Sequence, residues 1–299
     1  MTGDTEPTPS LGERLHAAAE ELLTAGASHD LDEARLEVEL LYGEAAGLTR
    51  AQVIAASREP AAPTHLAAFE VLLERRRGRE PLAYILGRRE FYGLTFEVGP
   101  GVLIPRPETE TLVETTLAAI REHPKARRLV RVADVGTGCG AVALAVSRHA
   151  PSAKVFATDA SSEALAWAGR NRTRFGLLDR VVLLTGDLLE PIGEPLDVIA
   201  ANLPYIPTDE YEDLPAEIRA GEPRLAVDGG DTGVDIVRSF VDQLPDHVAE
   251  GPVAVLLELG GGQHGLVGDW VVEALGGGDV EVHRDLAGNR RVLEVRRGY

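Results

Sequence analysis

The chain has 299 residues, of which 44% are hydrophobic, so it is long enough for one large or two ordinary domains with packed cores. Its formal net charge of −18 disfavours sequence-independent binding to nucleic acid, because phosphate contacts need clustered Lys and Arg. The single cysteine, Cys139, excludes an intramolecular disulfide and a cysteine-rich zinc site, so we expect a reducing, cytoplasmic location and no metal.

The N-terminal part, residues 1–85, predicts a small helical domain. Its first ten residues are polar and contain proline, and we expect them to form a disordered tail rather than a signal peptide. Three pairs of residues then show the spacing of a helix capping box, each followed by apolar residues at helical spacing. The pairs are Ser10–Glu13, Asp30–Glu33 and Thr49–Gln52. Thr64 is expected to open a fourth helix.

Residues 86–106 predict a β-hairpin that links this domain to the next one. Apolar residues alternate here, and Gly93 and the Gly99–Gly101 stretch are typical of turns. Pro107 is then expected to start a helix with acidic residues in its first turn, where they favour the helix dipole.

The remainder, residues 107–299, predicts an α/β domain of repeated strand, glycine-rich turn and helix. Five apolar strands are expected in "RLVRVADV", "AKVFATD", "RVVLLTGD", "LDVIAANLPY" and "PVAVLLELG". Repeated units of this kind indicate a mostly parallel sheet with helices on both faces. The last two segments, "VEVHRD" and "RRVLEVRR", are too close for a crossover helix and should pair antiparallel.

Three glycines, Gly136, Gly138 and Gly140, follow the first strand of this domain and stand two residues behind Asp134. Glycine at a strand-to-helix turn lets the backbone approach a ligand where a Cβ would collide. The spacing is one residue shorter than the dinucleotide fingerprint. A carboxylate here would repel a pyrophosphate and attract an ammonium or sulfonium group; a structural turn without a ligand is the alternative.

Acidic residues also end the next two strands. Asp159 can accept hydrogen bonds from two ribose hydroxyls, or it can cap the helix that follows. Asp187 is placed to meet an adenine amino group, with Leu188 beside the ring. Acids at three successive strand ends fit S-adenosylmethionine better than NAD or ATP.

The segment Asn202-Leu203-Pro204-Tyr205 follows the fourth strand. A residue before proline is extended, so the Leu203 carbonyl and the Asn202 side-chain oxygen can both point into a pocket. Two such acceptors match the two hydrogens of a planar –NH2 group, and Tyr205 offers a stacking face. We expect catalysis by holding the amide in place, with a proton acceptor that the sequence does not identify. A rigid loop with an Asn cap is the alternative.

These motifs resemble the HemK/PrmC family, methyltransferases that act on a glutamine side chain of peptide-chain release factors. The resemblance covers nearly the whole chain and includes "LIPRPETE", "DVGTGCGAVALA", "NLPYIP" and "DLAGNRRVLEVR". It implies a five-helix substrate-recognition domain, a hairpin linker and a class I, Rossmann-like methyltransferase domain with a seven-stranded sheet, acting as a monomer on release factors.

The resemblance also implies the residues of the site. Those expected to bind the cofactor are Asp134, Gly136, Thr137, Gly138, Cys139, Gly140, Asp159, Asp187, Leu188 and Asn202. Those expected to hold the substrate are Asn202, Leu203, Pro204 and Tyr205, which would also be catalytic, together with Arg106 and Glu108.

Leu203 departs from the family's usual Asn-Pro-Pro-Tyr tetrapeptide. Because only its backbone carbonyl is used and the residue is already extended, Leu203→Pro is expected to be nearly silent or mildly stabilising. The tripeptide Gly261-Gly262-Gln263 repeats the sequence methylated in release factors, and we expect it to be a turn.

Three other functions stay open at this stage. They are a glutamine methyltransferase of a ribosomal protein, an adenine-N6 nucleic-acid methyltransferase that uses base flipping, and a non-catalytic cofactor-binding module. The net charge disfavours the second, and the intact glycine loop and Asn202 disfavour the third.

Overall fold

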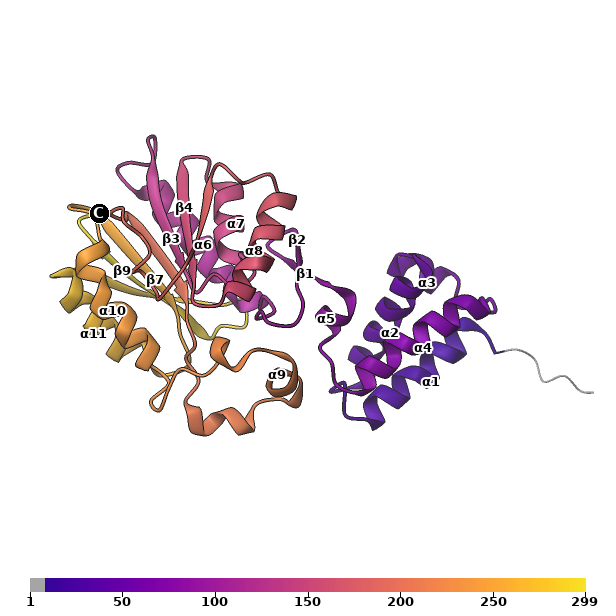
Figure 1. Ribbon diagram of the computed structural model, residues 1–299. Coiled ribbons are helices and arrows are strands. Elements are labelled where there is room, and N and C mark those ends of the chain that lie inside the picture. Colours follow the sequence, from indigo (N-terminus) through magenta and orange to yellow (C-terminus); the bar gives the residue numbers. More distant parts are fainter. Residues whose placement is uncertain (1–8) are drawn as a thin grey trace, which may run out of the picture. The chain divides into compact units, whose positions relative to one another are not determined.

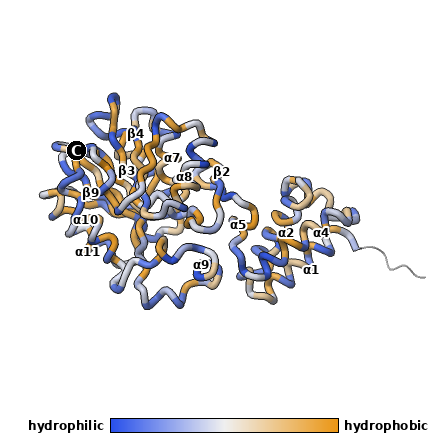
Figure 2. The backbone as a smooth tube through the Cα atoms, viewed as in Figure 1, coloured by the Kyte–Doolittle hydropathy of each residue, from blue (hydrophilic) through white to orange (hydrophobic). Residues whose placement is uncertain are grey.

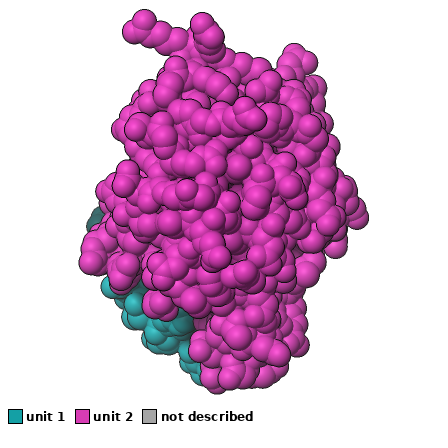
Figure 3. Space-filling view, turned by 90° about the vertical axis from the view of Figure 1, so that its left-hand side faces the viewer, with its two compact units in different colours: residues 1–87, 216–221 teal, residues 88–215, 222–299 magenta. Residues whose placement is uncertain are grey.

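The computed structural model describes residues 9–299, so most of the expected N-terminal tail lies outside the described residues (Figure 1). Contacts divide the chain into two compact units, coloured separately in Figure 3. A helical unit contains residues 9–87 and 216–221, and a sheet unit contains residues 88–215 and 222–299. Within residues 9–299, no helix is both long enough and apolar enough to cross a membrane.

The helical unit is an all-α bundle. Its helices are α1 (Leu11–Thr24), α2 (Leu31–Ala46), α3 (Arg50–Ala55), α4 (Pro63–Arg77) and α5 (Leu82–Leu86), joined by the short α9 (Ala216–Gly221) from much later in the chain. Side chains from α1, α2 and α4 form the core, among them Leu22, Leu41 and Phe69, which are all buried. The amphipathic spacing read from the sequence therefore faces one shared interior.

Two of the three predicted capping boxes are confirmed. Both partners bond reciprocally in the Ser10–Glu13 and Thr49–Gln52 pairs. Asp30 does cap α2, but the Glu33 carboxylate accepts from the His29 N–H rather than closing a box. The prediction that Thr64 opens α4 is wrong, because the helix starts at Pro63. Proline at the first helical position lacks an N–H and already has a helical φ, so it starts a helix without a side-chain cap.

A buried ion pair ties α9 into the helical unit. The Arg76 side chain is 2% exposed, and its guanidinium bonds both oxygens of Glu37, at 3.0 and 2.9 Å. The same guanidinium reaches Glu217 of α9 at 2.6 Å, and the Ser28 hydroxyl donates to Glu37 at 2.6 Å. Each oxygen of the Glu37 carboxylate therefore has a hydrogen-bonding partner inside the unit.

The hairpin expected as a linker consists of β1 (Arg88–Phe91) and β2 (Leu94–Glu97), paired antiparallel. Its residues belong to the sheet unit. The Phe96 ring packs edge-on against Phe175, with ring centroids 5.1 Å apart, and the Asn171 side chain accepts from the Glu97 N–H at 2.7 Å. These contacts make the hairpin part of that unit's packing, a property that its turn signals do not reveal.

Seven strands form the central sheet, as the sequence predicts. They are β3 (Val130–Val135), β4 (Ala153–Asp159), β5 (Val181–Thr185), β6 (Val198–Asn202), β7 (Val253–Glu258), β8 (Asp279–Arg284) and β9 (Arg290–Arg297). Their order is β5-β4-β3-β6-β7-β9-β8. β9 runs opposite to the other six strands and pairs antiparallel with both β7 and β8, which confirms the expected terminal pair.

Helices cover both faces of this sheet. They are α6 (Glu110–Glu122), α7 (Ala141–His149), α8 (Ser162–Arg174), α10 (Asp235–His247) and α11 (His264–Leu275), with the 3-10 turns η1 (Pro107–Thr109), η2 (Thr208–Asp213) and η3 (Arg224–Ala226). Alternate strand residues such as Val135 and Ile199 pack with Phe240 of α10 and Val267 of α11. The strands are coloured mainly as hydrophobic in Figure 2, as burial on both faces requires.

The strand order reverses between β3 and β6. From β3 the chain proceeds through β4 to β5 on one side, whereas β6 and β7 lie on the other side. Ligands of open α/β sheets bind outside the carboxyl ends of the strands at such a reversal. This topology brings the glycine loop after β3 and the Asn202 segment after β6 to the same crevice.

Candidate active site

A pocket opens at this reversal point. Most residues expected to meet a cofactor line it: Asp134, Gly136, Thr137, Gly138, Cys139, Asp159, Asp187, Leu188 and Asn202. Gly140 does not; it caps the start of α7 instead. Of the expected substrate residues, Asn202, Leu203 and Pro204 line the pocket, whereas Tyr205, Arg106 and Glu108 do not.

The glycine loop is held against β4 by its own backbone. The N–H groups of Gly136 and Thr137 both donate to the Thr158 carbonyl at 2.9 Å. Gly136 has φ +73°, and a Cβ there would lie 3.1 Å from the Leu203 side chain. A Cβ on Gly138 would approach only Val102, at 3.7 Å, so a longer side chain there would grow into the pocket. Both positions favour glycine because both have positive φ, +73° and +57°, and at Gly138 the need for ligand space is a second reason.

Asp134 lies beneath the loop. It is 3% exposed, and its Oδ2 accepts from the Thr137 hydroxyl at 2.6 Å and from the Ala143 N–H at 2.9 Å. Burial raises its pKa to about 6, although both hydrogen bonds act in the opposite direction. Asp134 therefore fixes the loop to the start of α7 and, when ionised, places a negative charge beneath the pocket.

Asp159 bridges the glycine loop and the next helix. Its Oδ2 accepts from the Gly138 N–H at 2.8 Å and its Oδ1 from the Ser161 N–H at 2.9 Å. The cap of α8 is Ser161, whose hydroxyl accepts from the Ala164 N–H, so the interpretation of Asp159 as the helix cap is wrong. Each carboxylate oxygen keeps a second acceptor site that can meet a ribose hydroxyl.

The end of β5 supplies the next part of the wall. Asp187 is exposed, whereas Leu188 is 8% exposed and has φ +48°. A positive φ is uncommon for a residue with a side chain, and strained backbone of this kind persists where the surroundings hold it. The conformation places the Leu188 side chain on the pocket wall while Asp187 stays open to solvent.

Asn202 ends β6 with its side-chain amide anchored. Its Nδ2 donates to the Thr109 hydroxyl at 3.1 Å. The next residue, Leu203, is only 4% exposed and packs in the sheet core. Leu203→Pro would therefore remove buried apolar atoms, which the expectation of a nearly silent change did not include.

The Gly261-Gly262-Gln263 tripeptide lies between β7 and α11. The Gln263 Nε2 donates to the Tyr205 carbonyl at 2.9 Å, and its Oε1 accepts from the Gly260 N–H at 3.0 Å. Both ends of the Gln263 side-chain amide are therefore hydrogen-bonded within the chain, and they hold the Tyr205 backbone in place. Burial raises the pKa of the Tyr205 hydroxyl, which therefore stays neutral at physiological pH.

Arg106 and Glu108, both expected to bind substrate, lie outside the lining of the pocket. The Arg106 guanidinium pairs with the buried Glu222 carboxylate, which also accepts from the Ile104 N–H at 3.1 Å. This pair fixes the segment before η1 to the segment before η3. Glu108 is exposed on η1.

Two polar residues at the site were not identified from the sequence. Thr109 is 5% exposed and lines the pocket. Glu258 ends β7, is 2% exposed and pairs in register with Asn202. Glu258 lies within the fifth expected strand, "PVAVLLELG", but its register against β6 depends on the order of the strands in the sheet. Apolar residues after η2 also line the pocket, namely Pro223, Leu225, Ala226 and Ile236.

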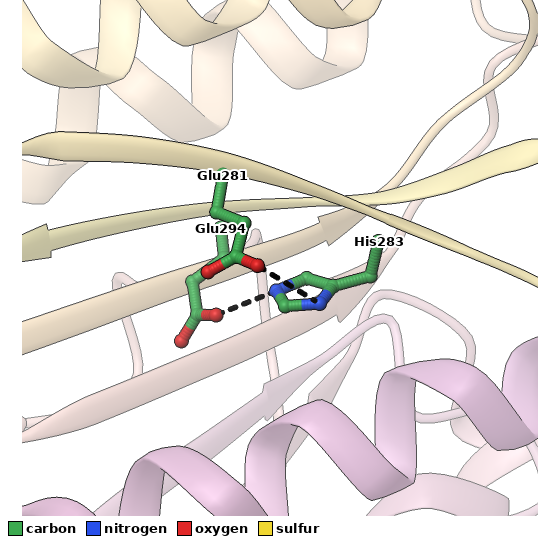
Figure 4. A group of neighbouring side chains, drawn as sticks. All are labelled: Glu281, His283 and Glu294. Carbon is green, nitrogen blue, oxygen red and sulfur yellow. Dashed lines mark hydrogen bonds and ion pairs between the residues drawn. The ribbon is translucent and has the colours of Figure 1, made fainter.

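A histidine–carboxylate group lies on β8 and β9, outside this pocket (Figure 4). In Glu281, His283 and Glu294 the atoms that could bind a metal lie within 4.8 Å of one another. His283 already bonds Glu294 at 2.7 Å, and Arg296 bonds the other oxygen at 2.6 Å. The buried Glu294 carboxylate is therefore matched by two basic side chains of the chain itself.

Solved structures share this fold. A methyltransferase from Pyrococcus furiosus is 22% identical, covers 69% of this chain and 90% of its own, and gives a TM-score of 0.51. The hMettl16 catalytic domain, solved with an RNA hairpin, is 15% identical, covers 73% of this chain and 79% of its own, and gives 0.52. Together with the strand order, these show a class I S-adenosylmethionine-dependent methyltransferase fold.

Family models and curated relatives identify the family, whereas the solved structures show only the fold. Residues 13–87 match the PrmC N-terminal domain and residues 111–231 match the methyltransferase small domain. The release factor glutamine methyltransferase of Geobacter sulfurreducens is 43% identical over 238 residues, 79% of this chain and 81% of that protein. The enzyme of the same name from Bradyrhizobium diazoefficiens is 36% identical over 289 residues, 97% of each chain. The chain therefore belongs to the release factor glutamine methyltransferase family, the HemK/PrmC family.

Proposed function

We propose that Asn202, Leu203 and Tyr205 hold the glutamine amide of a peptide-chain release factor beside S-adenosylmethionine bound in the pocket. The chain is an S-adenosylmethionine-dependent protein glutamine methyltransferase by family. The observation that carries the residue roles is the position of Asn202. It lies on the pocket wall at the strand-order reversal, with its amide nitrogen turned to Thr109.

The residues of the pocket fit this cofactor. Gly138 leaves space where any side chain would extend into the pocket, and Asp159 lies beside it with free acceptor sites. Leu188 offers an apolar surface for a base, next to the exposed Asp187. Ionised carboxylates around the pocket favour a sulfonium over a pyrophosphate. We assign Asp159 to the ribose, and Leu188 with Asp187 to the adenine.

The chemistry that S-adenosylmethionine supplies when bound is an activated methyl group, which passes to the amide nitrogen as the S–C bond breaks while the amide releases one proton. In our proposal the Asn202 Oδ1 and the Leu203 carbonyl oxygen accept hydrogen bonds from the two N–H groups of the substrate amide. The lone pair of the amide nitrogen is then left free to face the methyl group. Such positioning can supply up to about 7–11 kcal/mol, and fixed carbonyl dipoles favour the positive charge that develops on nitrogen.

Glutamine and adenine both offer a planar –NH2 group, so the tetrapeptide does not by itself select between them. The net charge of −18 supports a protein substrate, because a duplex would bring dense negative charge to an acidic protein. Family membership supports the release factor over a ribosomal protein.

The helical unit, in this proposal, recognises the body of the release factor, because the pocket-lining residues all come from the sheet unit. We also propose that the protein acts as a monomer. We propose a cytoplasmic location, because Cys139 is the single cysteine of the sequence and the fold therefore uses no intramolecular disulfide. Light scattering at assay concentration tests the monomer, and a dimer mass would refute it.

The substrate is tested with labelled S-adenosylmethionine and three purified acceptors: a release factor, ribosomal proteins and DNA. We expect methyl transfer to the release factor, lost when its Gly-Gly-Gln glutamine is changed to alanine. We expect no transfer to DNA at low salt, where any electrostatic attraction would be strongest. A methyl group on adenine, with none on the release factor, would overturn the proposal.

A further inference from the structure

A buried carboxyl group lies directly behind Asn202. Glu258 is 2% exposed at the end of β7, and it faces Asn202 across the parallel β6–β7 pair. Its Oε2 has no hydrogen-bond partner among the residues that the structure describes. An under-satisfied buried acceptor costs free energy, so its retention beside a binding pocket calls for a functional reason.

The hydrogen bonds around this carboxyl group have a fixed direction. The Thr109 and Asn202 side chains lie close enough to Glu258 to favour its ionised form, and Asn202 Nδ2 donates to Thr109 at 3.1 Å. A carboxylate can only accept. The Thr109 oxygen accepts from Asn202, and in our inference its hydroxyl turns its single hydrogen toward the ionised carboxylate, so that Thr109 offers only lone pairs to Asn202. Both neighbours therefore require a donor from the Asn202 amide.

An asparagine amide has nearly the same shape with its oxygen and nitrogen exchanged. In the exchanged orientation the Asn202 oxygen would face the lone pairs of Thr109 and Glu258, and its NH2 would face the substrate's own NH2. We infer that Glu258, acting with Thr109, is a positioning residue that holds the Asn202 nitrogen inward and so presents its oxygen to the target amide. This inference rests on the role proposed above for Asn202.

Three other titratable groups near Glu258 lie on three different segments of the chain. Arg291 of β9 favours its ionised form, Glu108 of η1 opposes it, and Tyr205 after β6 lies close enough to feel its charge. Burial is the largest influence and raises the pKa of Glu258 to about 7. Protonation replaces charge-assisted hydrogen bonds by weaker neutral ones, so the preference for one Asn202 orientation declines as the pH falls below about 7.

Glu258→Gln tests this directly, because glutamine keeps the shape but can also donate. A donating side-chain amide at this position lets the Thr109 hydroxyl turn its hydrogen to Asn202, which permits the exchanged orientation. We expect kcat to fall about ten- to a hundredfold at saturating cofactor and release factor. The Kd for S-adenosylmethionine should stay unchanged. The wild-type decline of kcat below about pH 7 should be absent from the variant.

Two further variants test the route through Thr109. Thr109→Val removes the hydroxyl while keeping the side-chain volume, and it should lower kcat as Glu258→Gln does. Thr109→Ser keeps the hydroxyl and should retain activity.

Glu294→Gln is the matched control for Glu258→Gln. Glu294 is also buried, at 1% exposed, on the neighbouring β9, but it pairs with His283 and Arg296. It should leave kcat and its pH profile as in the wild type.

The inference is overturned if Glu258→Gln or Thr109→Val turns over at the wild-type rate, or if Glu258→Gln keeps the acidic decline. The proposed role of Asn202 fails separately, when Asn202→Ala methylates the release factor normally. An inactive Asn202→Ala together with active Glu258→Gln and Thr109→Val would refute only the present inference.

Discussion

Two buried glutamates, one in each unit, show how differently the same side chain can be used. Glu37 in the helical unit has both oxygens bonded to Arg76 and a further bond from Ser28. Glu258 in the sheet unit has no cationic hydrogen-bond partner, and its Oε2 is unpartnered among the described residues. The first arrangement holds an element of the fold in place. The second carries an energetic cost beside the pocket, which is the pattern expected of a functional group.

Breaking the well-paired arrangement should have the largest effect on stability. Arg76→Met leaves Glu37 buried without its cation and releases Glu217 of α9. Removing one partner of a buried pair typically costs about 3–5 kcal/mol. We expect a loss of that size in the free energy of unfolding of the helical unit, measured by urea denaturation. Cofactor binding by the sheet unit should persist.

Arg75→Ala is the control for this change. Arg75 pairs with Glu80 on the same helix end but is 40% exposed, so its loss should cost less than about 1 kcal/mol. Equal destabilisation by the two variants would show that burial does not distinguish Arg76 from its neighbour.

Substitution of Glu258 should raise stability, whereas substitution of Arg76 should lower it. Burial raises the pKa of Glu258 from 4.5 to about 7, so between these pH values the native state keeps a proton that the unfolded state has released. Wild-type stability therefore falls as the pH rises through this window, by up to about 3 kcal/mol from this group. Glu258→Gln does not titrate, so the variant should gain stability relative to wild type from pH 4.5 to 7.

The measurement is the difference in free energy of unfolding between the two proteins across this pH range, in which titrations common to both cancel. A difference that stays constant with pH would contradict the raised pKa of Glu258.

Asp159 is intermediate between these two glutamates, because backbone N–H groups satisfy both of its oxygens while it still lines the pocket. Asp159→Asn can keep one backbone acceptor but loses the charge that strengthens ribose hydrogen bonds. We expect weaker binding of S-adenosylmethionine by roughly 1.5–3 kcal/mol per bond lost, read by calorimetry. Wild-type affinity in a folded Asp159→Asn protein would remove Asp159 from the cofactor site.

Among the substitutions at the pocket, the smallest effect is expected for Leu203. Leu203 is 4% exposed, so Leu203→Pro loses buried atoms, an effect partly offset because proline restricts the unfolded chain. We expect a net loss of about 1–2 kcal/mol in stability, with kcat retained because the backbone carbonyl remains. Loss of kcat in a folded Leu203→Pro protein would refute the role of that carbonyl.

The contrast also explains what the sequence could predict. The glycine loop, the strand-end acids and the Asn202 tetrapeptide are local patterns, so their spacing was sufficient to predict most of one pocket, although Gly140 and Tyr205 do not line it. The pairing of Glu258 with Asn202 depends on the register of β7 against β6, which no local pattern reports. The contact of Glu217 with Arg76 likewise joins residues far apart in the sequence. Arg106 was predicted to bind substrate because its ion-pair partner, Glu222, lies 116 positions away in the sequence.

The most direct test of the account is a single-turnover reaction of wild type and Asn202→Ala with a release factor, with the methyl group located by mass spectrometry. The account predicts a methyl group on the side-chain nitrogen of the Gly-Gly-Gln glutamine in the wild-type reaction. With Asn202→Ala it predicts a rate lower by about 10²–10³ and unchanged S-adenosylmethionine binding. A methyl group at another residue, or a wild-type rate in the Asn202→Ala reaction, would contradict it.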